Sequence, residues 1–189
     1  MTRIILASKS PRRRELMELL KVPFEVIVSD IDEQINPQND LVKEIEKLSF
    51  QKANAVYKDH QDALVIGSDT IVKIGNDVLG KPHSIRQAKE MLTELSDHTH
   101  EVVTGVTILY QGKAETFSSV AEVKFYPLSE KEIDEYIATN EPMDKAGAYG
   151  AQDNQDFLII KNISGSRDNV IGFPVDEIKA SLEKFKKIA

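Results

Sequence analysis

Apolar positions along the chain follow two different spacings, which divide it into predicted strands and helices. Short apolar or alternating runs, typical of β-strands, occupy residues 4–7, 24–28, 63–74, 101–110, 114–125 and 157–163. Between most of them, apolar residues recur every three to four positions, as expected for helices with one buried face. This alternation predicts an α/β fold in which helices flank a β-sheet.

Polar residues and glycines set the expected boundaries of these elements. Residues that favour helix N-caps precede four helical segments: Ser10, Asp40, Ser84 and Ser129. Gln87 and Glu132 complete capping-box patterns with the last two, and Pro174 begins a closing helix. Gly75-Asn76 and Gln111-Gly112 are turn sequences. The second joins two long alternating runs and predicts an antiparallel hairpin, so we expect a mixed sheet.

The composition narrows the possible classes of function. With 189 residues, the chain is long enough for a sizeable core, and we expect a single domain over residues 1–189. The absence of cysteine excludes disulfide scaffolds, thiol nucleophiles and iron–sulfur centres. A net charge of −7 opposes broad binding of nucleic acids or anionic membranes. No apolar run approaches the ~20 residues of a membrane helix and no export signal is present, so we expect a cytoplasmic protein.

The segment between the first strand and the first helix has the residues of an anion site. Ser8 and Ser10 supply hydroxyls, and Arg12, Arg13 and Arg14 supply guanidinium groups that suit phosphate oxygens. A helix N-terminus adds unpaired amide groups and partial positive charge. Because successive helical residues point about 100° apart, the three arginines cannot all face one ligand. The alternative is a solubilising basic turn.

Carboxylates provide the second set of candidates. Asp69 lies within an apolar strand, where a charged group is costly unless it is paired or functional. Asp30, Asp32 and Glu33 place three acids within four residues, which suits a hard cation. The alternatives are a strand-end Asp bonded to a turn and an acidic, solvated loop.

Further candidates are individually ambiguous. Lys81, in Gly80-Lys-Pro82, either contacts a phosphate or lies in an ordinary turn. Lys52 is either a site residue or a solvated lysine on a helix. Gln152 ends a stretch of small residues, 145–153, and is able to read a base edge, unless the stretch is only a flexible connector. His98-Thr-His100 is expected at an exposed strand start.

Taken together, these segments resemble the Maf family of nucleotide pyrophosphatases over nearly the whole chain. The matching segments are Leu6-Ala-Ser-Lys-Ser-Pro-Arg-Arg13, Glu33, Lys52-Ala53, Gly67-Ser-Asp-Thr70, Gly80-Lys-Pro82, Thr104-Gly105-Val106, Ala146-Gly-Ala-Tyr-Gly150, Gln152 and Asn169-Val-Ile-Gly-Phe-Pro174. Each is weak alone, but their order and spacing are specific. The resemblance implies a mixed α/β sheet with flanking helices and two lobes around a central cleft, similar to the inosine triphosphate pyrophosphatase fold.

The resemblance also implies an activity: hydrolysis of a nucleoside triphosphate to the monophosphate and pyrophosphate, with Mg²⁺, Mn²⁺ or Co²⁺ as a divalent cofactor. It assigns the catalytic base to Asp69 and the metal ligands to Glu33 and Asp69. The phosphate-binding residues it implies are Ser8, Ser10, Arg12, Arg13, Lys52 and Lys81. The subgroup that prefers dTTP and UTP carries matches to Arg12, Thr70 and Gln152.

Two other functions are compatible with parts of this sequence. The family name is tied to septum formation and cell-division arrest, so a regulatory binding protein with a basic docking patch is an alternative. In a metal hydrolase, however, carboxylates such as Asp69 and Glu33 have a role that a polyanion-binding surface lacks. A general inosine-triphosphate enzyme would prefer purines. The substrate is the expected partner, with no stable nucleic acid and no membrane, and a homodimer is left open.

Overall fold

The predicted strands pair in one mixed sheet in the computed structural model, which describes residues 2–186. Its strand order is β2-β1-β3-β5-β6-β7, and β4 pairs with β3. The bounds are β1 (Ile4–Ala7), β2 (Glu25–Val26), β3 (Leu64–Ile74), β4 (Asp77–Leu79), β5 (Thr99–Tyr110), β6 (Lys113–Phe125) and β7 (Ile160–Ser164). Strand β1 is parallel to β2 and β3, whereas β3–β4 and β6–β7 are antiparallel.

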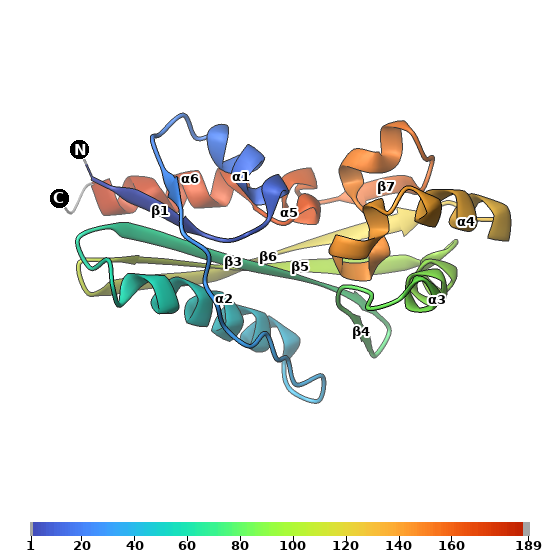
Figure 1. Cartoon of the computed structure of the whole chain (residues 1–189), viewed down its shortest axis with the longest axis horizontal. Coiled ribbons are helices and arrows are strands. Elements are labelled where there is room, and N and C mark those ends of the chain that lie inside the picture. Colours follow the sequence, from blue (N-terminus) through green and yellow to red (C-terminus); the bar gives the residue numbers. More distant parts are fainter. Residues whose placement is uncertain (1, 187–189) are drawn as a thin grey trace. The chain divides into compact units, whose positions relative to one another are not determined.

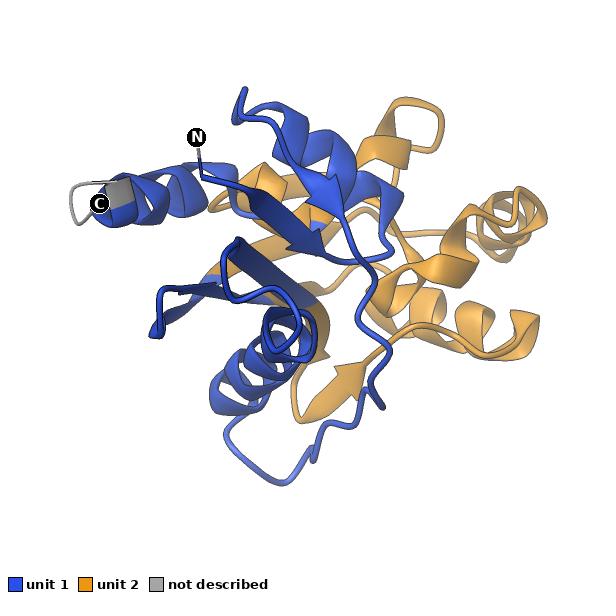
Figure 2. Ribbon diagram, turned by 60° about the vertical axis from the view of Figure 1, so that its left-hand side comes forward, with its two compact units in different colours: residues 1–69, 104–119, 172–189 blue, residues 70–103, 120–171 orange. Residues whose placement is uncertain are grey.

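Two compact units divide the chain (Figure 2). Unit 1 comprises residues 1–69, 104–119 and 172–189, and unit 2 comprises residues 70–103 and 120–171. Strands β3, β5 and β6 each continue from one unit into the other, so neither unit is a continuous stretch of sequence.

Unit 1 is built around strands β1 and β3. Its helices are α1 (Pro11–Glu18), α2 (Leu41–Tyr57) and α6 (Val175–Lys186). Helix α2 lies on one side of these strands, and α1 and α6 lie on the other (Figure 1). Because side chains alternate along a strand, Ile5 and Val65 pack toward a cluster that includes Ala53 and Val56 of α2. The parallel register pairs Ile5 with Val65.

Unit 2 contains the second large apolar cluster. Its helices and 3₁₀ turns are α3 (Ile85–Leu95), α4 (Glu130–Ala138), η1 (Glu141–Asp144), η2 (Ala146–Ala148), η3 (Ala151–Gln155) and α5 (Arg167–Ile171). Buried residues of α3 and α4, among them Leu92 and Tyr136, meet Phe125 of β6 and Tyr149 of the segment after α4 in this cluster. Edge-to-face packing of Phe125 on Tyr149, with ring centres 4.7 Å apart, fixes that segment against the sheet.

Most expected boundaries are confirmed. Ser10, Asp40, Ser84 and Ser129 all cap helices through their side chains. The capping box at Ser129 is complete. At Ser84 the predicted box is wrong, because the Gln87 side chain accepts a hydrogen bond from the amide of His83 and not from that of Ser84. Positive φ angles at Gln111 and Gly112 form the predicted hairpin turn.

Several predictions of local structure are wrong. The strand expected at 24–28 shortens to two residues, and the one expected at 157–163 begins at Ile160, because Asn154 binds the amides of Ile159 and Ile160. Helix α5 and the three 3₁₀ turns were not anticipated. No helix within residues 2–186 has both the length and the apolar character needed to cross a bilayer.

Candidate active site

The start of α1 separates three consecutive arginines by exposure. Arg13 is 9% exposed, whereas Arg12 is half-buried and Arg14 is exposed. Successive helical positions point about 100° apart, so only one of the three faces inward. Arg14 instead approaches Glu18 one turn along the helix. Of the three arginines, Arg13 alone is therefore buried.

Two serine hydroxyls organise the backbone before Arg13. The Ser10 oxygen accepts a hydrogen bond from the amide of Arg13 at 3.4 Å, which makes it the N-cap of α1. The oxygen of Ser8, which is buried, accepts from the amide of Ser10 at 3.2 Å. Each serine oxygen thus accepts a hydrogen bond from a backbone amide. The hydroxyl hydrogen rotates about the C–O bond and is able to donate a hydrogen bond to an anion.

Arg13 is held from two directions. Its Nε donates to the carbonyl of Gly172 at 2.9 Å, and its Nη2 lies 3.5 Å from Oδ1 of Asp69. Burial lowers the pKa of Arg13, and the negative charge of Asp69 opposes that shift. A guanidinium stays protonated in proteins, so unit 1 holds a desolvated positive charge at this place.

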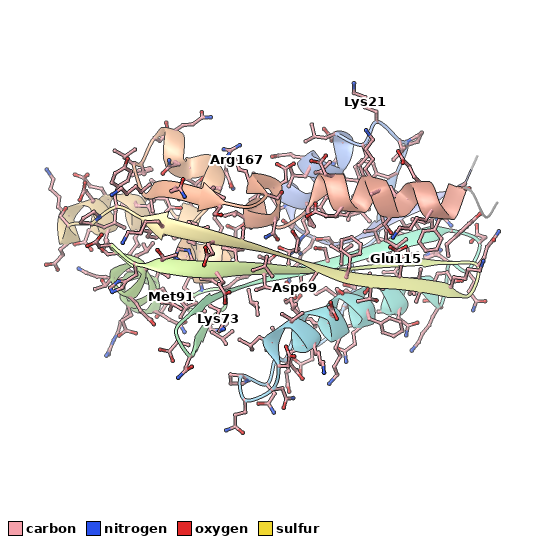
Figure 3. All side chains as sticks on the ribbon, turned by 180° about the vertical axis from the view of Figure 1, so that it is seen from behind. Lys21, Asp69, Lys73, Met91, Glu115 and Arg167 are labelled. Carbon is pink, nitrogen blue, oxygen red and sulfur yellow. The ribbon has the colours of Figure 1, made fainter. Side chains whose placement is uncertain are left out.

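Lys52 lies at the centre of a cluster of charged side chains that also contains Arg13, Asp69 and Glu33. It lies on α2 and is only 5% exposed, which corrects the solvated-helix alternative. Its Nζ lies 2.8 Å from Oδ2 of Asp69 and 2.9 Å from Oε1 of Glu33. The ammonium therefore lies between the two carboxylates that the sequence marked as metal ligands. Asp69 stands on β3 (Figure 3), where it and Thr70 are half-buried between the buried Ser68 and Ile71.

Glycines on two strands explain why Lys52 reaches this position. A Cβ on Gly67 would lie 2.5 Å from the carbonyl oxygen of Ser49 and 2.6 Å from the amide of Ala53, both on α2. A Cβ on Gly105 would lie 2.6 Å from the carbonyl oxygen of Ile45. Both contacts are too close for any side chain, so the two glycines allow α2 to approach the sheet closely.

The carboxylates of this cluster fit a metal that is completed by substrate. Glu33 and Asp69 contact the same ammonium, and no group of three or more His, Cys, Asp or Glu suited to a metal occurs within residues 2–186. Mg²⁺ is commonly held by one or two carboxylates together with phosphate oxygens and water. Of the other acids in the loop, Asp32 accepts a hydrogen bond from the exposed Gln34 side chain.

The remaining predicted site residues belong to unit 2. Lys81 is exposed after β4, and its loop is tied to the 145–153 segment because the amide of Gly147 donates to the carbonyl of Gly80 at 3.0 Å. Gln152 lies in η3, and its Oε1 is buried with no hydrogen-bond partner among the described residues. Thr70 is half-buried on β3. Unit 2 therefore brings the loops of Lys81 and Gln152 together.

His100 departs from its expected place. It is 2% exposed, and its Nε2 lies 2.7 Å from the hydroxyl of Tyr149. Its ring also packs edge-on against Phe125. Burial lowers the pKa of His100 to about 4, so the ring is neutral near pH 7. The signal in the sequence for this burial is strand alternation, because His100 shares one face of β5 with the buried Val102 and Val106.

Comparison with known protein families gives a match over nearly the whole chain. The profile described as Maf-like protein matches residues 3–185. The chain belongs to the Maf family. Within this Maf-family chain, the buried Arg13 and Lys52 and the half-buried Asp69 all lie in the segments that carry the family resemblance.

Curated relatives match at nearly full length. This Maf-family chain is 45% identical over 185 residues to a dTTP/UTP pyrophosphatase of Bacillus cytotoxicus, covering 98% of this chain and 96% of the relative. A dTTP/UTP pyrophosphatase of Bacillus cereus matches at the same identity and coverage. Among solved structures, the Staphylococcus aureus Ham1 protein aligns with a TM-score of 0.54 at 16% identity, covering 97% of this chain and 99% of that one. That likeness supports a shared fold alone.

Proposed function

We propose that the protein hydrolyses nucleoside triphosphates, dTTP and UTP in particular, to the monophosphate and pyrophosphate. The observation that carries this proposal is the cluster in which the buried cations Arg13 and Lys52 lie within 3.5 Å of the carboxylates of Asp69 and Glu33. The curated relatives named dTTP/UTP pyrophosphatase support the same activity. Their close match in length supports treating residues 1–189 as one catalytic domain.

Phosphate binding is the first task of such a site. A triphosphate brings about four negative charges to a protein whose own net charge is −7, so attraction must be local. We assign the contacts to the hydroxyls and cations named by the resemblance: Ser8, Ser10, Arg12, Arg13, Lys52 and Lys81. The N-terminus of α1 adds amide groups and partial positive charge beside the two serines.

Glu33 and Asp69 are the residues that would hold a divalent cation. The oxygens of both carboxylates contact the ammonium of Lys52 in the structure. When both carboxylates bind a metal, the Lys52 ammonium would therefore move toward the phosphates. The metal, Mg²⁺, Mn²⁺ or Co²⁺, would neutralise charge on the phosphates and on the departing pyrophosphate. Lys52 would then hold its positive charge beside the phosphates, while Arg13 would keep its own next to Asp69.

Asp69 is proposed as the base. A water molecule attacks the α-phosphorus, a new O–P bond forms, and the bond from that phosphorus to the bridging oxygen breaks. Pyrophosphate takes the bonding electrons, and Asp69 accepts the proton of the water. The carboxylate has two oxygens, so one is able to contact the metal while the other accepts the proton. Arg13, which lies 3.5 Å from Oδ1, would keep the carboxylate oriented after Lys52 leaves Oδ2.

Gln152 is proposed to select the base, together with Arg12 and Thr70. Its unpartnered Oε1 would accept from the N3–H of thymine or uracil, and its amide group would donate to O4. Cytosine offers the opposite pattern, so it would leave both groups of Gln152 unpaired. Such mismatches discriminate more strongly than a missing methyl group.

The regulatory-binding alternative is not favoured. A surface that docks polyanions gains nothing from two carboxylates beside its arginine and lysine, whereas a metal hydrolase needs them. Roles in cell division, a homodimer and a cytoplasmic location stay predictions.

Pyrophosphate release from a panel of triphosphates tests the proposal. We expect dTTP and UTP to be hydrolysed best with Mg²⁺, Mn²⁺ or Co²⁺, CTP clearly less well, and no turnover with excess chelator. Asp69→Asn serves as the inactive control. Higher kcat/KM for CTP or for a purine triphosphate would refute the specificity, and absence of any triphosphate hydrolysis would refute the enzyme class.

A further inference from the structure

A second buried lysine lies beside the segment that carries Gln152. Lys145 is 3% exposed, and its Nζ donates to the carbonyl oxygen of Glu141 at 2.6 Å and to Oε2 of the same residue at 2.7 Å. The same Nζ lies 3.3 Å from Oδ2 of Asp153. Asp153 follows Gln152 directly in the chain, so a charged contact is made one residue from the proposed base-reading amide.

Tyr136 of α4 completes the network. Its hydroxyl donates to Oδ2 of Asp153 at 2.6 Å and accepts from the amide of Gly150 at 3.1 Å. Burial and the hydrogen bond to Asp153 both raise the pKa of Tyr136, so the hydroxyl stays protonated and keeps donating. One buried hydroxyl thereby binds the chain on both sides of Gln152.

The backbone of the segment is adapted to this network. A Cβ on Gly150 would lie 2.7 Å from Cε of Lys145 and 2.8 Å from Oδ2 of Asp153, so a larger residue here would displace one of these side chains from the network. Gly147 and Ala148 take consecutive left-handed conformations, with φ of 69° and 60°. A chain with this backbone strain keeps one conformation only when its surroundings hold it.

We infer that Tyr136, Asp153 and Lys145 are positioning residues that fix the Gln152 side chain for base recognition. This inference rests on the proposed function. None of the three needs to touch the substrate, because a fixed Oε1 and amide group are what discriminate between uracil and cytosine. Without the network, Gln152 would still be present but free to turn its amide, and the unfavourable pairing with cytosine would be relieved.

Tyr136→Phe is the sharpest test, because it removes one hydroxyl and keeps the ring. We expect KM for dTTP to rise ~10-fold while kcat stays within about twofold, the pattern of a lost binding contact. KM for CTP should not rise, because the unfavourable pairing with cytosine is relieved, so the dTTP/CTP ratio of kcat/KM falls at least ~10-fold. Lys145→Met should reproduce this fall, and Lys145→Arg should restore part of the ratio.

Ile133→Val is the matched control. It removes one buried methyl group from the same helix, three residues from Tyr136, and leaves the network intact. We expect it to lower stability modestly and to keep the dTTP/CTP ratio of the wild type. An equal loss for both nucleotides in Tyr136→Phe, or an unchanged ratio, would overturn the inference.

Hydrogen exchange separates this inference from the proposed function. The amide of Gly150 loses its acceptor in Tyr136→Phe, so residues 147–152 should exchange faster without any nucleotide, while Ile133→Val should leave them at the wild-type rate. Unchanged exchange in Tyr136→Phe would overturn the positioning role. Faster exchange in a protein that hydrolyses no triphosphate would keep the positioning role and refute only the proposed function.

Discussion

Replacing Lys52 by Met removes a cation from between two carboxylates and keeps the length of the side chain. In the native structure its Nζ lies 2.8 Å from Asp69 and 2.9 Å from Glu33, and the lysine is 5% exposed. Lys52→Met therefore leaves two carboxylates facing each other without that ammonium, and we expect it to create a site that binds a divalent cation before any nucleotide arrives.

The expected loss of stability follows from burial. Removing one partner of a buried ion pair costs about 3–5 kcal/mol. Asp69 keeps Arg13 at 3.5 Å, and the Glu33 side chain is 34% exposed, so the low end of about 3 kcal/mol applies. For a chain of this size the melting temperature would fall by about 6–12 °C. A cation at 100 times its Kd would return about 2.7 kcal/mol, which is most of the loss.

Thermal unfolding with and without Mn²⁺, in the absence of nucleotide, measures both effects. Lys52→Met should melt below the wild type and recover with Mn²⁺, whereas Mn²⁺ or a chelator should barely change the melting temperature of the wild type. Lys89→Met is the matched control. Lys89 also bridges two carboxylates, Glu130 at 2.8 Å and Asp134 at 2.9 Å, but at the surface.

Two results would refute this reasoning. If Mn²⁺ stabilises the wild type and Lys52→Met equally, the ammonium does not occupy the cation position. If Lys52→Met melts like Lys89→Met, for which exposed pairs predict a loss of only about 0–1 kcal/mol, the buried pairs are not formed in solution.

Three further predictions concern single residues. Asp69→Asn should lower kcat by ~10²–10⁴ in a protein that still folds, and retention of more than about half the activity would exclude Asp69 as the base. Arg13→Ala should lower kcat/KM for dTTP by ~10²-fold and the exposed Arg14→Ala by less than about twofold, so equal losses would show that the wrong arginine was assigned. His100, whose pKa falls from 6.5 to about 4 on burial, should stabilise the fold fully above pH 6.5 and lose that contribution as the pH falls toward 4. Because the unfolded chain binds the proton more readily, the free energy of unfolding of the wild type should fall by about 3 kcal/mol over this range. Urea unfolding at each pH measures this fall, and the contribution from position 100 should be absent in His100→Gln.

Local chemistry in the sequence determined much of this protein. The caps at Ser10 and Ser129 and the turn at Gln111-Gly112 depend on residues one to three positions apart, so the chain alone specifies them. The sequence also specifies that the three arginines cannot all be buried. Successive helical residues point about 100° apart, so Arg13 and Arg14 face different directions whichever side of the helix is packed.

Only the tertiary structure decided which charged residues meet. Nothing local distinguishes the buried Lys52 from a solvated helix lysine, because its burial depends on how closely Gly67 and Gly105 let α2 approach the strands. Lys145 in the same way looks like one charge in a flexible stretch, until Asp153 folds back against it. Contacts between residues far apart in the chain depend on packing and loop closure over the whole fold, and no spacing along the sequence encodes them.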